Sequence, residues 1–190
     1  MDITNFYFRG NRNYLHSASL FDHIIENYVA KRYEPVNIDF SINKLTDRNC
    51  IIISKTQSEQ FLGKIIGQYT DSLSQLIIYE SNDKITQHFP YDEEEIKRHC
   101  KMVGNQRIIC DDIRNYSFID RAVAAYKFLL TSIFGEAYGK YLFARIMIDF
   151  IPKGNISVTH FRSISNSFFQ GTISHKRNEI GTIIYGAKKV

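Results

Sequence analysis

The feature that most constrains the fold is a stretch that occurs twice in related form. Residues 11–30, NRNYLHSASLFDHIIENYVA, read as a polar loop that turns into an amphipathic helix. The Arg-Asn-Tyr triplet at 12–14 recurs at 114–116, and an apolar helical pattern follows each copy. A recurrence of this kind predicts that one structural unit was duplicated within the chain.

The first unit is expected to run over residues 1–83. Ser17 or Ser19 can cap a helix, and apolar residues then recur at three- and four-residue spacing. Pro35 cannot continue that helix, which therefore ends by about Tyr33. Runs rich in β-branched and aromatic residues, separated by turn residues, predict strands. The expected strands are 3–9, 36–45, 50–54, 61–69 and 76–80.

A polar segment, 84–101, is expected to connect this unit to a second one over residues 102–190. Its acidic stretch after Pro90 is typical of the first turn of a short helix. In the second unit Ser117 and Asp120 have capping-box spacing ahead of an apolar helix. Strands are expected at 103–110, 141–150, 156–164, 168–174 and 181–187, and the helix at 122–134. Further short matches keep the same order in both units: 38–40 with 148–150, 61–65 with 169–173, and 77–79 with 183–185.

Composition limits the partners. The net charge of +4 fits an anionic small molecule, or a solvated surface that is slightly basic. The basic residues are too scattered to favour nucleic acid, and no apolar stretch is long enough to cross a membrane. Three cysteines without CxxC spacing predict no disulfide framework and no structural zinc site, with Cys50 a buried apolar residue. Asp2 and Arg9 argue against a signal peptide. We expect a cytoplasmic protein without cofactor or metal.

The predicted element order carries a resemblance. A strand, a long apolar helix and an antiparallel meander that wraps it resemble the hotdog fold, and two such units resemble a double hotdog. The resemblance implies an α+β protein with two tandem units of strand, long helix and four-strand antiparallel meander, whose strands form one continuous sheet around two helices. The HFPGxP-like loop of dehydratases and the DxxGHVNN-like loop of thioesterases are not present in full, so no specific family is predicted.

The same resemblance implies a function. Hotdog proteins mostly bind acyl thioesters of coenzyme A or acyl carrier protein and act as dehydratases, thioesterases or acyl-transfer enzymes. The thioester would lie between the two units, and the chain would be a monomeric pseudo-dimer or a homodimer. A binding module without turnover, with the same fold, is the alternative. A structural or regulatory α+β protein without a small ligand is a third possibility.

Two residues are the candidates for acid/base chemistry. His16 stands just before a helix N-terminus, where the helix dipole favours a neutral imidazole able to act as a base. The resemblance implies that its partner is a carboxylate on the helix of the other unit, which points to Asp120, with Asp22 a weaker choice. The structural alternatives are a loop histidine bonded to nearby backbone and a capping carboxylate. Phe118 takes the place of His16 in the second copy, which would put one active site with the first unit.

The repeated triplets supply candidates for substrate binding. Arg12 and Arg114 could bind phosphates or a carboxylate with two hydrogen bonds each. Tyr14 and Tyr116 could donate to a thioester carbonyl. Because both copies keep all three residues, a structural role in shaping the loop is favoured. His23 lies on the apolar helix stripe beside Phe21 and Ile24 and is interpreted as a structural histidine. His160 and His175 lie in predicted strands with no acidic partner nearby in sequence, and they are also interpreted as structural, with a zinc site as the weaker alternative.

Overall fold

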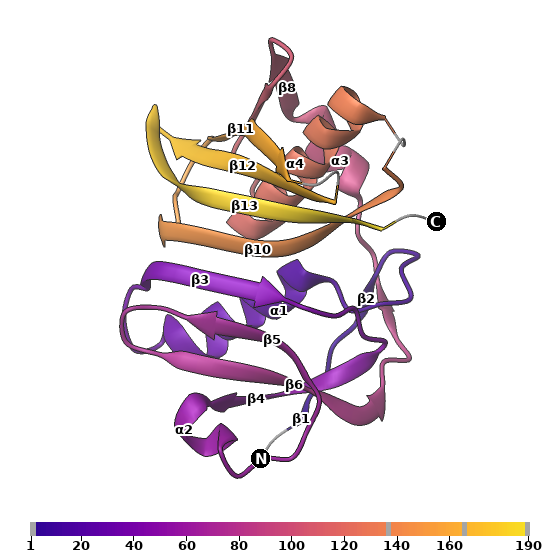
Figure 1. The fold of residues 1–190 in the computed structure, drawn as a ribbon, viewed down its shortest axis with the longest axis vertical. Coiled ribbons are helices and arrows are strands. Elements are labelled where there is room, and N and C mark those ends of the chain that lie inside the picture. Colours follow the sequence, from indigo (N-terminus) through magenta and orange to yellow (C-terminus); the bar gives the residue numbers. More distant parts are fainter. Residues whose placement is uncertain (1–2, 136–137, 165–166, 189–190) are drawn as a thin grey trace. The chain divides into compact units, whose positions relative to one another are not determined.

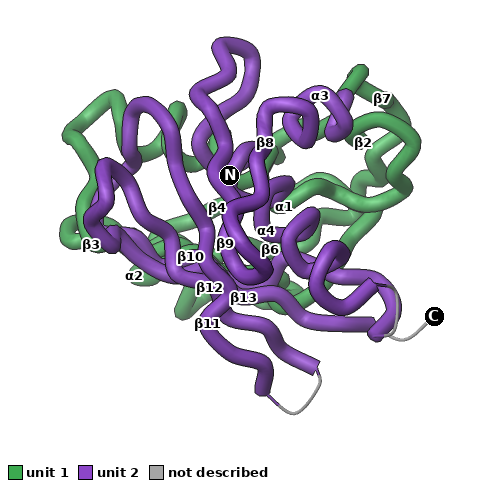
Figure 2. Tube along the Cα trace, turned by 90° about the horizontal axis from the view of Figure 1, so that it is seen from above, with its two compact units in different colours: residues 1–91 green, residues 92–190 purple. Residues whose placement is uncertain are grey.

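The computed structural model describes residues 3–135, 138–164 and 167–188. The chain divides into two compact units, Met1–Tyr91 and Asp92–Val190 (Figures 1 and 2). The division falls inside segment 84–101, which also contains secondary structure of its own. Among the described residues, no helix is both long enough and apolar enough to cross a membrane.

Unit 1 is a helix against a twisted antiparallel sheet. Each β-strand pairs with its neighbours in the order β1-β4-β6-β5-β3. A separate parallel ribbon joins β2 to β7. The elements of unit 1 are β1 (Ile3–Thr4), β2 (Phe8–Arg9), α1 (Ser17–Ile24), the π-helical turn η1 (Ile25–Val29), β3 (Val36–Ile42), β4 (Arg48–Ser54), α2 (Lys55–Ser58), β5 (Ile65–Thr70), β6 (Gln75–Lys84) and β7 (His88–Phe89).

The apolar stripe predicted for 11–30 packs in the core of unit 1. Phe21 of α1 meets Phe40 of β3 edge to face, with ring centroids 5.4 Å apart. Ile24 and Val29 are fully buried. Cys50 on β4 is also fully buried, as its apolar surroundings predicted, and burial raises the pKa of its thiol to about 12. The core of unit 1 therefore lies between α1 and the sheet.

Unit 2 has the longer helix and longer strands. Its sheet order is β8-β9-β11-β12-β13-β10, antiparallel throughout. The predicted single strand at 103–110 is instead a hairpin, because Gly104 takes a positive φ of 63° and turns the chain. The elements are α3 (Glu93–Arg98), β8 (Cys100–Val103), β9 (Arg107–Cys110), α4 (Phe118–Phe134), β10 (Lys140–Phe150), β11 (Ile156–Ile164), β12 (Phe168–His175) and β13 (Asn178–Lys188).

Helix α4 begins at the predicted capping box. The Ser117 hydroxyl accepts from the Asp120 N–H, and the Asp120 carboxylate accepts from the Ser117 N–H, at 3.2 and 3.4 Å. Most of the helix is buried through its first three turns. The Tyr185 hydroxyl of β13 donates to the Val123 carbonyl of α4 at 2.6 Å, which fixes the helix against the sheet.

Strand pairing differs from a simple meander in both units. In unit 1 the first strand after the helix, β3, pairs with β5, whereas in unit 2 the equivalent strand, β10, pairs with β13. The strand before each helix does take the same place, since β1 pairs with β4 and β9 pairs with β11. Hydrophobic alternation identifies strands but not their neighbours, and long connections let the third or fourth strand return beside the first. The third and fourth strands after the helix therefore take opposite places in the two sheets: β5 lies beside β3 in unit 1, whereas β13 lies beside β10 in unit 2.

Candidate functional site

The loop before α1 places His16 at the helix start. His16 is the N-cap residue, with an extended backbone (φ −77°, ψ 128°), and its carbonyl accepts from the Ser19 N–H at 3.0 Å. The N–H of Leu15 donates to the Thr46 carbonyl at 2.7 Å, which ties the loop to the start of β4. His16 is only 6% exposed. The structure therefore places His16 at the N-terminus of α1, as the sequence predicted.

Two arginines and a histidine lie around the ring of Tyr91. The guanidinium groups of Arg9 and Arg12 lie 4.9 and 5.3 Å from the centroid of the Tyr91 ring. The imidazole of His16 lies against the same ring, with centroids 5.7 Å apart. Arg9 also forms an ion pair of 3.6 Å with Asp22 of α1. Two guanidinium groups and an imidazole around one ring form a basic cluster, which suits a phosphate or carboxylate. We call Arg9, Arg12, His16 and Tyr91 the loop cluster.

The sequence analysis missed Tyr91 because no local pattern links it to the loop. The β2–β7 ribbon makes that link, since Arg9 pairs with Phe89. His88 adds a hydrogen bond of 2.8 Å from Nδ1 to the Gly10 carbonyl. Tyr14, predicted to bind substrate, is half-buried in the same loop. The ribbon thus brings Tyr91 beside Arg9, Arg12 and His16, although these three residues lie far before it in the sequence.

The second triplet lies in a different environment. The Tyr116 hydroxyl donates to Glu95 Oε2 at 2.6 Å and lies 3.0 Å from the Asp92 carbonyl oxygen. Burial, together with this carboxylate, raises the pKa of Tyr116 to about 12. Arg114 is exposed, and Asp120 is buried in its capping box. Tyr116 therefore joins the loop before α4 to α3, which is the structural role the repeat favoured.

A buried histidine of unit 2 was interpreted as structural, and its partner was not foreseen. Nδ1 of His160 on β11 lies 3.0 Å from the Tyr126 hydroxyl, and Nε2 lies 3.3 Å from Ser163 Oγ. Phe134 and Phe169 surround the imidazole. A sequence signal was available, because period-two spacing puts His160 on the same face of the predicted strand as Ile156 and Val158.

The partners of His160 decide its tautomer. Among the described residues, the Tyr126 hydroxyl has one hydrogen-bond partner, Nδ1 of His160. A buried phenol is best satisfied as a donor, so we assign Nδ1 as the acceptor and Nε2 as the protonated nitrogen. Burial lowers the pKa of His160, which favours this neutral form. Ser163 therefore faces an N–H rather than a base, and the pair is not arranged as a serine nucleophile with its general base.

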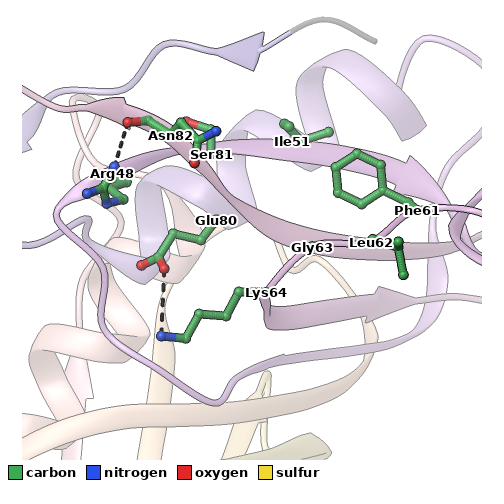
Figure 3. Close-up of a pocket in the computed structure, with 9 residues that line it drawn as sticks. All are labelled: Arg48, Ile51, Phe61, Leu62, Gly63, Lys64, Glu80, Ser81 and Asn82. Carbon is green, nitrogen blue, oxygen red and sulfur yellow. Dashed lines mark hydrogen bonds and ion pairs between the residues drawn. The ribbon is translucent and has the colours of Figure 1, made fainter.

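A pocket of about 390 Å³ opens on unit 1 (Figure 3). Glu80 accepts from the Thr46 hydroxyl at 2.6 Å and forms ion pairs with Lys44 and Lys64 at 3.2 and 3.9 Å. The hydrogen bond from Thr46, then the lysines, lower the pKa of Glu80. The pocket is lined by Arg48, Ile51, Phe61, Leu62, Gly63, Lys64, Glu80, Ser81 and Asn82, and none of the predicted site residues is among them.

In the part of the chain that is described, no group of three or more His, Cys, Asp or Glu side chains lies close enough to hold a metal ion. His160 and His175 of unit 2 instead make hydrogen bonds within the fold, to Tyr126 and to the Asn155 carbonyl.

Comparison with known proteins identifies the fold. No protein-family model and no curated protein sequence matches this chain. Among solved structures, the dehydratase domain of RzxB from Pseudomonas fluorescens matches 97% of this chain and 92% of its own length, with a TM-score of 0.52 and 10% identity. The tesB protein of Mycobacterium avium subsp. paratuberculosis matches 97% of this chain and 90% of its own, with a TM-score of 0.49 and 9% identity.

A third structure is a monomeric dehydratase domain from a trans-AT polyketide synthase split module. It matches 93% of this chain and 91% of its own, with a TM-score of 0.46 and 11% identity. At such low sequence identity, the match to the RzxB domain is evidence for the fold alone. The predicted α+β double-hotdog fold is confirmed, and the two units described above are its two halves.

Proposed function

We propose that the chain processes an acyl thioester, carried by coenzyme A or an acyl carrier protein, as a dehydratase or a thioesterase. The observation that carries this proposal is the position of His16. It is a buried imidazole at the N-terminus of α1, and it shares the Tyr91 ring with two arginines. The double-hotdog fold, shared with a dehydratase domain, supports the substrate class.

In the proposed dehydration, His16 and Asp120 move two protons. The imidazole of His16 removes a proton from the carbon next to the thioester carbonyl. Asp120 gives a proton to the hydroxyl on the following carbon, which leaves as water and produces an enoyl thioester. In the proposed hydrolysis, His16 activates a water that attacks the carbonyl, and the thiol of the carrier leaves. The same base serves both reactions, so the substrate decides between them.

The two triplets have proposed roles in binding. Arg12 and Arg114 would contact phosphates of the carrier, and Tyr14 and Tyr116 would donate to the thioester carbonyl. Arg12 has the stronger support, because it lies in the loop cluster beside His16. Tyr116 would first have to exchange its bond to Glu95.

One observation favours a second candidate, an acyl-binding module without turnover. The Asp120 carboxylate already accepts from the Ser117 N–H and completes the capping box of α4. A carboxylate in this position has a structural reason to be present without any catalysis.

The test is an assay of the whole chain on a panel of 3-hydroxyacyl and acyl thioesters, each as the coenzyme A ester and as the N-acetylcysteamine ester. We expect His16→Ala to lower kcat/KM at least a hundredfold, which is typical for the loss of a general base. Asp120→Asn keeps an acceptor for the helix cap and removes the acid, so kcat should fall while the melting temperature changes little. Arg12→Ala should raise KM for the coenzyme A ester only, because the short ester carries no phosphate.

The outcomes separate the two candidates. If His16→Ala leaves turnover unchanged, His16 is not the base. Binding of a non-reactive thioether analogue of the coenzyme A ester, with no turnover of any ester, would favour the binding module.

A further inference from the structure

The hairpin β8–β9 brings two of the three cysteines together. Cys100 and Cys110 are direct cross-strand partners, and neither is in a disulfide. Cys100 is half-buried and Cys110 fully buried. The spacing of Cys100 and Cys110 in the sequence matches no motif, because the two residues are brought together by the turn at Gly104.

The register shows which kind of cross-strand position they occupy. Next along the hairpin, the Asp111 N–H donates to the His99 carbonyl at 3.1 Å. Hydrogen-bonded and non-hydrogen-bonded pairs alternate along an antiparallel ladder, so Cys100 and Cys110 form a non-hydrogen-bonded pair. Side chains are closest at such pairs, with Cα atoms about 4.5 Å apart. Disulfides span Cα distances of roughly 4.4–6.8 Å, so this position lies within their range, near its short end.

The two thiols perturb each other's acidity. The neighbouring Cys100 thiol lowers the pKa of Cys110, and the nearby Arg121 guanidinium lowers it further. The Cys110 thiol, together with burial, raises the pKa of Cys100. Arg121 is held in place by the Asp111 and Gly154 carbonyls at 3.1 and 2.9 Å.

We propose that Cys100 and Cys110 form a reversible dithiol–disulfide site that reacts with low-molecular-weight disulfides such as oxidised glutathione. Cys100 is the half-exposed thiol that the oxidant can reach; it gives its proton to solvent and attacks one sulfur of the oxidant, and the first glutathione leaves and takes up a proton. The Cys110 sulfur then attacks the Cys100 sulfur of the mixed disulfide, and the second glutathione leaves. Two electrons and two protons pass from the two thiols to one oxidised glutathione. Because Cα separation at this position is near the short limit, the bond is reducible by dithiols.

Cys50 is the internal control. It is fully buried on β4, so an oxidant in solution does not reach its thiol, and it should not react. Trypsin cleaves after Lys101 and after Arg107, between the two reactive cysteines, so their disulfide would link two separate peptides.

The experiment equilibrates the whole chain in mixtures of reduced and oxidised glutathione, quenches with acid, alkylates under denaturing conditions and measures intact mass. We expect alkylated thiols to fall from the three cysteines of the chain to one as the oxidised fraction rises, and to return with dithiothreitol. Peptide mapping should recover the linked Cys100 and Cys110 peptides. Cys50→Ser should leave this loss unchanged, whereas Cys100→Ser and Cys110→Ser should each abolish the link.

Two outcomes would overturn the proposal. One is a count of three alkylated thiols across the full range of mixtures. The other is a glutathione adduct on Cys100 that never resolves to the linked peptides. Because both readings come from the unmodified chain, they stand even if a buried Cys110 variant fails to fold.

Discussion

At the scale of single residues, His160 shows how one neighbour can set a protonation state. Tyr126 donates to Nδ1, so a second proton on the ring would displace the hydroxyl proton of a buried phenol. Burial lowers the pKa of His160 below the ordinary value of 6.5. The unfolded chain then binds more protons than the folded one as the pH falls below that value.

We therefore predict that the free energy of unfolding is highest above about pH 6.5 and decreases as the pH falls toward the pKa of folded His160. His160→Phe combined with Tyr126→Phe should flatten this dependence, because the titrating imidazole is removed and no buried hydroxyl is left without its acceptor. Urea unfolding across that pH range measures it. His23 also has a pKa lowered by burial, so His23→Gln in the same background separates its share. An unchanged slope in the double variant would contradict the assignment.

A glycine beside the same tyrosine gives a second prediction. A Cβ on Gly171 of β12 would lie 2.8 and 2.9 Å from ring carbons of Tyr126. A Cβ on Gly186 of β13 would have more room, since its nearest neighbour is a Phe168 carbon at 3.8 Å. Gly171→Ala should lower the free energy of unfolding by about 1–3 kcal/mol, through overpacking. Gly186→Ala is the matched control and should stay within about 0.5 kcal/mol. Equal losses in the two variants, measured by urea unfolding, would show that strand flexibility and not the Tyr126 contact sets the effect.

At the scale of elements, the turn between β5 and β6 depends on one carboxylate. Asp71 accepts from the backbone N–H of Leu73 and Ser74 at 2.8 and 2.7 Å, and from the hydroxyls of Tyr33 and Tyr69 at 2.8 and 2.6 Å. Asp71→Ala should lower the free energy of unfolding by about 2–3 kcal/mol, because the fully buried Tyr69 hydroxyl loses its acceptor. In a Tyr69→Phe background the same change should cost less. Additive losses in denaturant titrations would argue that the two side chains do not act together.

Sequence patterns predicted the helices and strands much better than they predicted which strands pair with each other. The long strands β10 to β13 and helix α4 were predicted because period-two and period-3.6 patterns are local, and Ser117 with Asp120 is a local cap. The β8–β9 hairpin, the β2–β7 ribbon and the strand order were not, since pairing depends on residues far apart in sequence. The candidate site divides in the same way. His16 was found from its helix, and Tyr91 was not, because only the ribbon brings it to the loop.

At the scale of the whole molecule, the charge pattern predicts how the substrate is captured. The chain carries a net charge of +4, and the loop cluster places two of its arginines around one ring. If the proposed substrate is a coenzyme A thioester, kcat/KM should fall several-fold as salt rises from about 0.01 M to 1 M, because the Debye length shortens from about 30 Å to 3 Å. The uncharged N-acetylcysteamine ester is the control and should change little. A parallel fall for both esters would indicate a salt effect on the protein itself.

The π-helical turn at the end of α1 affects how this sequence would align with those of related proteins. There the Ala30 N–H reaches back to the Ile25 carbonyl at 2.7 Å, and Val29 rather than Tyr28 is the fully buried residue of the turn. Such a turn holds one residue more than an α-turn. It therefore corresponds to the insertion of one residue into an α-helix that keeps its buried face. A relative with a plain helix would align with this chain only if a one-residue gap is placed between Ile25 and Val29, and the two flanks would otherwise be compared out of step.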